Sequence, residues 1–190
     1  MNEIYYEETA TIKNEKSARL KYNILNVLSI ISYCLILFWV FIFLTTFIHV
    51  NIIVDIIVFI IPSTIFVLIG YFLGRFKNKF YIEYDYAFVS GTIRIAKVIK
   101  TIKRKFLLEF DCSAIEKIGL YGSHTYDSYA KMPGIKIEIL TQNDYPLVDK
   151  EFYYIVANVN AEKTIFIFEC TKTFIINVLK YSKKTVLEKE

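Results

Sequence analysis

Residues 22–48 read YNILNVLSIISYCLILFWVFIFLTTFI, a run without a charged side chain. After a short link, residues 56–74 read IIVFIIPSTIFVLIGYFLG and are again uncharged. An α-helix of about 20 apolar residues crosses the hydrocarbon core of a bilayer, and a helix satisfies its own backbone hydrogen bonds there. The two runs therefore predict a transmembrane helical hairpin over residues 22–75, with spans at about 22–48 and 52–74.

Positive charge gathers at the outer ends of the two runs and is missing from the link, which contains His49, Asn51 and Asp55. Short cytoplasmic flanks carry the excess of Lys and Arg, so both termini are expected to be cytoplasmic, at the cell membrane. The first run is too long for a secretory leader, begins after a polar segment and lacks a small-residue cleavage site. The flanking cations are Lys13, Lys16, Arg19 and Lys21 before the first run and Arg75, Lys77 and Lys79 after the second.

The chain has room for the hairpin and one further domain. Residues 1–21 mix charges of both signs. They are expected to form a solvated cytoplasmic segment that either becomes helical toward the bilayer or packs on the later domain. Residues 76–190 are close to the usual size of one compact domain, about 100–150 residues. We therefore expect a single water-facing domain.

Past Lys79 the hydrophobic period changes from helical to two, which is typical of strands with one buried face. A β-hairpin is predicted over 81–95 with its turn at Ser90-Gly91, and further strands over 104–110, 115–121, 135–141, 151–157 and 163–169. Residues 171–187 return to helical spacing. The predicted fold class is α+β. It is a transmembrane hairpin followed by a seven-stranded antiparallel β-barrel or sandwich closed by a C-terminal helix, the element order of a pleckstrin-homology-like (PH-like) domain.

Four strings of the sequence carry a resemblance to a known family. They are EYDYAFVSGTIRI at 83–95, KRK at 103–105 leading to Phe110-Asp111, YGSH at 121–124 and DSY at 127–129. With them the chain resembles, over nearly its whole length, an uncharacterised family of small bacterial membrane proteins. The resemblance implies a two-helix hairpin followed by a bacterial PH-like domain, with no known activity. The sequence departs from the family pattern at 92–95, where an acidic stretch is expected, so its first β-hairpin is more basic.

A basic segment lies within and after the first β-hairpin. Between Arg75 and Lys105, nine cations stand against Glu83 and Asp85. Held near anionic headgroups, each Lys or Arg contributes about 1 kcal/mol, an attraction that decays within a Debye length. The alternative is a solvated hairpin tip that only follows the positive-inside rule. The candidate anionic-lipid-binding residues are Lys97, Lys100, Lys103, Arg104 and Lys105.

Ser123, His124 and Asp127 are the residue types of a hydrolytic triad. A triad needs the base to reach the nucleophile on one side and the orienting acid on the other, a geometry usually drawn from separate elements. Their crowding after Gly122 instead favours a loop over residues 121–129 whose polar side chains hydrogen-bond its own backbone. No catalytic residue is predicted, and the chain is not expected to be an enzyme.

Metal and cofactor chemistry find no support in the sequence. His49 and His124 are expected on opposite sides of the membrane, and no phosphate-binding glycine motif is present. Cys34, Cys112 and Cys170 lack ligand spacing and are interpreted as reduced, buried thiols. We expect no metal and no cofactor. A net charge of only +4 on a membrane-tethered chain also disfavours nucleic acid as a partner.

Gly70 and Gly74 stand four residues apart near the end of the second run, the spacing that lets helix backbones approach closely. They are the candidate helix-packing residues. Gly70 either faces the first helix of the same hairpin or supports a homo-oligomer, and the spacing alone does not decide between the two.

Together these features predict a membrane-anchored, non-catalytic binding or scaffold protein with a cytoplasmic PH-like domain. Its expected partners are the bilayer, anionic lipid headgroups, and a membrane protein, a peptide or a second copy of the chain. The competing hypothesis is a small enzyme that acts on a lipid or envelope substrate at the membrane surface through the 121–129 loop. A deep pocket lined by that loop, with a titratable pair of strongly perturbed pKa, would favour the enzyme.

Overall fold

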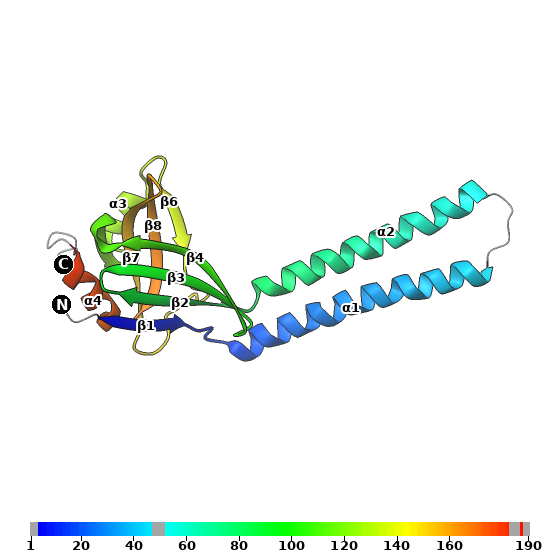
Figure 1. The fold of residues 1–190 in the computed structure, drawn as a ribbon, viewed down its shortest axis with the longest axis horizontal. Helices are drawn as coiled ribbons and strands as arrows, with labels where there is room; N and C mark the ends of the chain where they lie inside the picture. The colour runs from blue at the N-terminus through cyan, green and yellow to red at the C-terminus, as the bar shows by residue number, and fades with distance from the viewer. Residues whose placement is uncertain (1–3, 47–51, 183–186, 188–190) are drawn as a thin grey trace. The chain divides into compact units, whose positions relative to one another are not determined.

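The computed structural model describes residues 4–46, 52–182 and 187, over which the chain forms four α-helices and eight β-strands (Figure 1). His49 and Asn51 of the predicted link lie outside the described residues.

The chain divides into two compact units. The hairpin unit is Asn14–Tyr81, and the sheet unit combines Met1–Lys13 with Ile82–Glu190. The N-terminal segment expected over residues 1–21 is therefore shared between the two. The hairpin unit is an insertion in the sequence of the sheet unit.

The hairpin unit consists of α1 (Glu15–Thr46), α2 (Ile52–Phe76) and a 3-10 turn, η1 (Lys77–Lys79). Asn14 precedes α1, and its Oδ1 accepts a hydrogen bond from Ser17 N at 3.2 Å, the bond of a helix N-cap. Both helices are long and apolar enough to cross a membrane, by length and composition.

Hydroxyl groups and small residues lie between α1 and α2. Ser29 Oγ donates to the Gly70 carbonyl at 2.8 Å, and Ser32 Oγ donates to the Phe66 carbonyl at 2.7 Å. Both serines are buried, whereas most Leu, Ile and Val side chains of the two helices are exposed. Small residues and hydrogen bonds at the contact are typical of helices that pair in lipid.

Sheet A has the strand order β1-β2-β3-β4, with every neighbouring pair antiparallel. β1 pairs with β2 from Tyr5↔Val89 to Ala10↔Tyr84, although the whole hairpin unit separates them in sequence. The prediction of seven strands missed β1 because its partner follows this insertion. The strands are β1 (Tyr5–Ala10), β2 (Ile82–Val89), β3 (Thr92–Ile99) and β4 (Lys103–Asp111).

Glu8 holds β1 against the C-terminal part of the sheet unit. Its carboxylate accepts hydrogen bonds from Thr171 N at 3.1 Å and Thr171 Oγ1 at 3.0 Å, and it lies 2.9 Å from Lys150 Nζ. Thr171 is the N-cap of α4 (Lys172–Tyr181), where negative charge is favourable. β1 is therefore an integral part of the sheet unit.

Sheet B has the order β5-β7-β8-β6, and β6 pairs with β8 in parallel. This parallel pair departs from the predicted antiparallel pairing, and the other strand pairs of the two sheets are antiparallel as predicted. Because β8 lies between β6 and β7, the chain joins them through the long 140–150 segment instead of a tight turn. A short helix, α3 (His124–Ala130), separates β5 from β6. The strands are β5 (Ile115–Leu120), β6 (Lys136–Ile139), β7 (Glu151–Val159) and β8 (Glu162–Cys170), with a 3-10 turn η2 (Cys112–Ala114) before β5.

Glu169, a fully buried residue of β8, fixes the 140–150 segment. Its carboxylate accepts hydrogen bonds from Thr141 Oγ1, from Asn143 Nδ2 at 2.7 Å and from Leu147 N at 2.9 Å. A buried carboxylate is tolerated when hydrogen bonds satisfy its oxygens. These bonds set the path of the connection that makes parallel pairing of β6 feasible.

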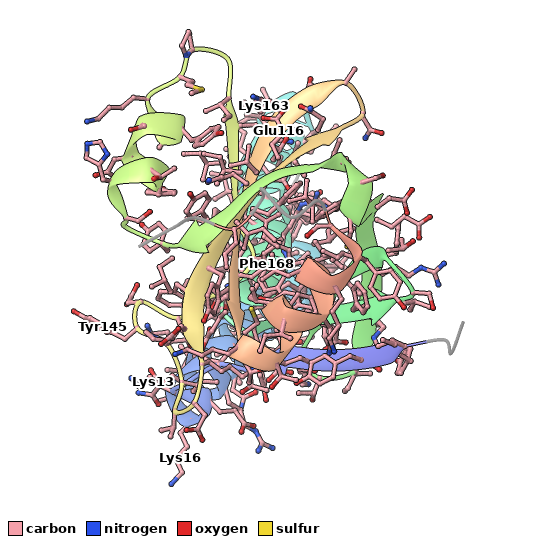
Figure 2. The ribbon with its side chains drawn as sticks, turned by 90° about the vertical axis from the view of Figure 1, so that its left-hand side faces the viewer. Lys13, Lys16, Glu116, Tyr145, Lys163 and Phe168 are labelled. Carbon is pink, nitrogen blue, oxygen red and sulfur yellow. The ribbon has the colours of Figure 1, made fainter. Side chains whose placement is uncertain are left out.

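The core lies between the two sheets, and α4 covers one end of it (Figure 1). Phe168 lies in the middle of this core (Figure 2), with its ring centroid 5.0 Å from that of Tyr86 and 6.1 Å from that of Phe174. The two sheets contain eight strands in place of the predicted seven, and of the predicted barrel or sandwich no closed barrel forms over the described residues. The main core residues are Tyr86, Phe88, Ile93, Ile155, Phe166, Phe168, Phe174 and Val178.

The C-terminal helix is shorter than the predicted 171–187. α4 ends at Tyr181 because Ser182 adopts an extended conformation, with φ −92° and ψ 171°. Residues 183–186 lie outside the described residues, and Leu187 forms an isolated parallel bridge with Ile118 of β5.

Candidate functional site

The basic tip, residues 97–105, contains all five predicted lipid-binding cations. The strand register pairs Ile99 of β3 with Ile82 on one side and with Lys103 on the other. Ile82 is the first residue of β2, and Ala10 ends β1 at the same end of the sheet. The basic tip therefore lies where the chain leaves sheet A toward α1 and returns from α2. We refer to this edge as the junction end of sheet A.

The turn of the basic tip has Lys100 and Thr101 as its central residues, and the connection between β3 and β4 spans residues 100–102. Ile102 N donates to the Ile99 carbonyl at 3.2 Å, and the φ angles of Lys100 and Thr101 are +53° and +56°. Positive φ at both central residues is the geometry of a type I′ hairpin, which prefers Asn and Gly. A β-branched residue such as Thr101 is disfavoured there.

Arg104 differs from Lys103 and Lys105 because two carboxylates bind it. Its Nη2 lies 2.5 Å from Asp85 Oδ2 and 2.7 Å from Glu7 Oε1, reaching across β3. These contacts, Asp85 first, raise the pKa of the guanidinium. The Tyr5 hydroxyl donates to Glu7 at 2.5 Å, and this bond, followed by Arg104, lowers the pKa of Glu7. Arg104 thus links β4 to β1 and β2.

The lysines of the basic tip occupy its turn and both strands. Lys97 stands opposite Lys105 in the β3–β4 register, and Lys103 lies on the same face as Lys105. Lys100, Lys103 and Lys105 are exposed, and Lys97 is half-buried. Within the described part of the chain, Lys103 and Lys105 form no ion pair. The junction end of sheet A therefore carries a concentrated positive charge.

Residues 121–129 contain a helix where a loop was predicted. α3 begins after Ser123, whose Oγ accepts a hydrogen bond from Tyr126 N at 3.2 Å as the N-cap. Ser128 Oγ donates to the His124 carbonyl at 2.9 Å. These hydroxyls bind backbone groups of the segment itself.

α3 covers part of the outer face of sheet B. The Tyr126 ring lies 5.6 Å from the Tyr154 ring, and Tyr129 and Ala130 pack on the same buried cluster. Tyr126, Tyr129 and Ala130 have the i, i+3, i+4 spacing of one helix face. That spacing is the sequence signal from which α3 could have been predicted.

A depression of about 340 Å³ lies on the uncovered part of sheet B. Its lining includes Tyr121, Phe152, Ile167 and Thr141. Ser123, His124 and Asp127 are not among its lining residues in the described structure. Sequence proximity therefore does not bring these three side chains to a shared cavity there.

Cations and aromatic rings contact each other where the hairpin unit begins and ends, near the start of α1 and after the end of α2. Lys77 Nζ donates to Asn26 Oδ1 at 2.7 Å and lies 5.6 Å from the centroid of the Tyr22 ring. Lys21 Nζ lies 6.0 Å from the centroid of the Phe80 ring. Aromatic rings and long cationic side chains of this kind are typical of a membrane–water interface.

Gly70 and Gly74 face α1 within the hairpin unit. A Cβ atom on Gly70 would lie 2.9 Å from the Tyr33 ring, and one on Gly74 would lie 3.3 Å from Ser29 Oγ. The first distance is too short for a carbon–carbon contact, so Tyr33 fits only because Gly70 has no side chain. The close approach seen here is within one chain, and a homo-oligomer stays a prediction.

The three cysteines are free thiols in different surroundings. Cys112 and Cys170 are buried, but Cys34 is exposed on α1, so the prediction of three buried thiols is wrong for Cys34. Burial raises the pKa of Cys112 to about 12 and the pKa of Cys170 well above its usual range. Among the described residues, no group of three or more His, Cys, Asp or Glu side chains could hold a metal ion.

The two sheets, the core between them and the C-terminal helix agree with a comparison against known families. The family described as Bacterial PH-like domain (DUF6106) matches residues 2–188. The chain belongs to this family. The matched region of the PH-like protein includes the hairpin unit as well as both sheets. No curated protein and no solved structure matches the chain.

Sequence reasoning missed the carboxylates that organise the PH-like protein around its basic tip. Glu7 and Asp85 bind Arg104, and Glu8 connects β1 with α4. The Tyr and Thr residues of β1 favour a strand, which is a signal for β1 itself. Nothing in the local sequence identifies β2 as its partner.

Proposed function

We propose that this PH-like protein is a membrane-anchored, non-catalytic binding module. In this proposal α1 and α2 cross a bilayer, and the basic tip holds the sheet unit on anionic lipid at the cytoplasmic face of the same membrane. The observation that carries the proposal is the pairing of β1 with β2 around the inserted hairpin, with the basic tip at the junction end.

The β1–β2 pairing supports an even number of membrane crossings. β1 precedes α1 and β2 follows α2, yet the two strands are neighbours in one sheet. A single crossing would place them on opposite sides of the bilayer, and cleavage of a leader containing α1 would remove β1. Two crossings keep both strands on one side.

The exposure of the helices supports lipid as their surroundings. Leu37 is 72% exposed, whereas Ser29 and Ser32 at the helix contact are 5% and 4% exposed. A core helix of a water-soluble protein buries its apolar side chains, and a large exposed apolar surface is unfavourable in water. Lipid tails remove this penalty.

The distribution of charge supports a cytoplasmic sheet unit. Lys16, Arg19 and Lys21 lie in the first turns of α1, and the chain after Gly74 carries Arg75, Lys77 and Lys79. Residues 47–55 contain neither Lys nor Arg. The positive-inside rule then places the outer helix ends, and the sheet unit joined to them, on the cytoplasmic side.

The lysines of the basic tip supply the attraction to lipid. Lys103 and Lys105 would together contribute about 2 kcal/mol near an anionic surface, and Lys100 at the turn adds to this positive charge. Arg104 contributes less, since Glu7 and Asp85 already bind it. The attraction reaches only about 10 Å at 0.1 M salt. At the junction end, Ala10 of β1 and Ile82 of β2 are joined to α1 and α2 by only a few residues, which favours this short range.

Lysine acetylation of the full-length chain in reconstituted vesicles tests the proposal. A water-soluble reagent should modify Lys103 and Lys105 less in vesicles that contain phosphatidylglycerol than in phosphatidylcholine vesicles, and high salt should abolish the difference. Lys131, exposed after α3, is the internal control and should react equally in both. Equal modification of all three lysines in both lipids would refute the lipid-binding role.

Reporters fused to the two termini test the orientation independently. Both are expected to report the cytoplasm, and an external signal from either terminus contradicts the proposed topology.

Crosslinking in intact membranes distinguishes lipid from protein at the basic tip. A protein captured specifically through Lys103 would favour a protein partner at this surface.

A further inference from the structure

We infer that Ile102 is a membrane-inserting anchor, which enters the interfacial region of the bilayer while Lys100 and Lys103 contact the anionic headgroups around it. The inference rests on the proposed function, because it requires that the junction end of sheet A lie on lipid. The Ile102 side chain would add an apolar contact to the attraction between the lysines and the headgroups. This contact would set the depth of the turn in the bilayer.

Ile102 is an exposed apolar residue of the basic tip. It is 79% exposed and is the last residue of the connection between β3 and β4. The β3–β4 connection has three residues, whereas the β2–β3 and β7–β8 connections have two each, and Ile102 is the residue that the longer connection adds before the next strand. An apolar side chain between exposed lysines is the composition of segments that lie in a membrane interface.

The turn keeps a backbone conformation that its residues disfavour. Thr101 has φ +56°, and its Oγ1 donates to the Lys100 carbonyl at 2.6 Å. The hairpin itself requires positive φ here, and Asn or Gly would favour that conformation more than Thr101 does. The turn holds Lys100 and Ile102 on either side of Thr101.

A second exposed side chain lies near the start of the hairpin insertion. The Tyr145 ring centroid is 5.9 Å from Lys13 Nζ, and Figure 2 shows both residues at the periphery of the sheet unit. Lys13 is the last residue of the sheet unit before the hairpin unit. Tyrosine is enriched at membrane interfaces because its ring is amphipathic. The sheet unit therefore presents an aromatic side chain here in addition to the basic tip.

Tryptophan fluorescence of the full-length chain tests the inference. Trp39 is the single tryptophan, so Trp39→Phe gives a background without tryptophan emission. In that background, Ile102→Trp places a probe at the basic tip. Tyr5→Trp places a matched probe at the opposite end of sheet A, where Tyr5 is 64% exposed and pairs with Val89. Each chain is reconstituted in vesicles of phosphatidylcholine and phosphatidylglycerol with brominated acyl chains, which quench tryptophan.

We expect the emission of the Ile102→Trp chain to be blue-shifted and quenched, and that of the Tyr5→Trp chain to be unquenched. If neither probe is quenched while Lys103 stays protected from acetylation, insertion is overturned and the proposed function stands. If neither probe is quenched and Lys103 is also unprotected, both are overturned.

A second variant keeps the test independent of the tryptophan substitutions. Ile102→Asn in the native background retains a turn-compatible residue but removes the apolar side chain. It should increase acetylation of Lys103 in phosphatidylglycerol vesicles, because the tip would lie less deeply. Acetylation equal to that of the native chain would overturn the role of Ile102.

Discussion

The hairpin unit and the sheet unit place opposite kinds of side chain in their interiors. In the sheet unit Tyr86, Phe88 and Phe168 are fully buried, whereas in the hairpin unit the serines Ser29 and Ser32 are buried and the apolar side chains face outward. Water drives apolar groups inward, but lipid provides no such force between helices. The contrast is the one that the proposed combination of a membrane hairpin with a water-exposed sheet unit requires.

Phe168→Ala should give the largest loss in the free energy of unfolding, since it removes a buried ring from the hydrophobic core of the sheet unit. A buried Phe→Ala change costs about 3–5 kcal/mol. Denaturant unfolding of the full-length chain in detergent, followed by the circular dichroism of the sheets, measures the loss. Trp39 emission, which reports on the hairpin unit, should stay unchanged. Phe106→Ala, on an exposed residue of β4, is the control and should cost much less.

Leu37→Lys tests the opposite surface, because Leu37 faces outward on α1. A lysine near the centre of a membrane span costs about 2.5–3.5 kcal/mol. The fraction of the chain integrated into membranes should fall accordingly. Val148→Lys is the matched control on the sheet unit, where Val148 is 88% exposed and a surface change costs about 0.5 kcal/mol or less. Equal tolerance of both lysines would show that α1 faces water.

Ser29→Ala examines the interior of the hairpin unit and should have a smaller effect. It removes the hydrogen bond to the Gly70 carbonyl, and such bonds between membrane helices average about 0.6 kcal/mol, with a maximum of about 1.7. Unfolding of the hairpin by a denaturing detergent, followed by Trp39 emission, measures the change. Ser63→Ala is the control, since Ser63 Oγ donates within its own helix, to the Phe59 carbonyl at 2.8 Å.

Acidification should weaken the link from β1 to β4, and this is the smallest expected effect. The pKa of Glu7 is lowered in the folded chain by Tyr5 and then by Arg104. Its contribution to stability is therefore present above the unfolded pKa and is lost as pH falls through the lowered folded pKa. For an exposed ion pair we expect about 1 kcal/mol or less.

Comparison of the native chain with Glu7→Gln isolates this contribution. The difference in free energy of unfolding should be present near neutral pH and vanish in acid. Tyr5→Phe removes the first cause of the pKa shift and should reproduce part of the difference. A difference that does not change with pH would contradict the role of the Glu7 charge.

Local patterns predicted most of the elements. The hairpin over 81–95 is confirmed as β2 and β3, and the other predicted strands correspond to β4 through β8. Period and turn chemistry are local properties, which explains this agreement. The missed elements, β1 and α3, are short and carry several charged or polar residues, so their amphipathic pattern is weak. The parallel pairing of β6 was not predicted because it depends on how the 140–150 segment crosses the sheet.

The candidate site was predicted in composition but not in arrangement. Five cations in residues 97–105 were identified, and a β-hairpin does bring them together. Their individual surroundings differ, because Glu7 and Asp85 bind Arg104. Glu7 lies on β1, which is distant from Arg104 in sequence, and Asp85 lies on β2, which β3 separates from the strand of Arg104. Ser123 serves as the N-cap of α3, a role that residue type alone did not distinguish from a nucleophile.

By itself, the sequence determined two helices long and apolar enough for a bilayer, the alternation that makes strands, and the excess of cations beside both. These features follow from the length, the hydrophobic period and the composition of single segments, which are local properties of the sequence. Only the tertiary structure decided that β1 completes sheet A from the other side of the hairpin, and that β6 joins β8 in parallel. It also decided that the basic tip lies at the junction end. The β1–β2 and β6–β8 pairings depend on hydrogen bonds between residues far apart in the chain, and such pairings leave no mark on either segment alone.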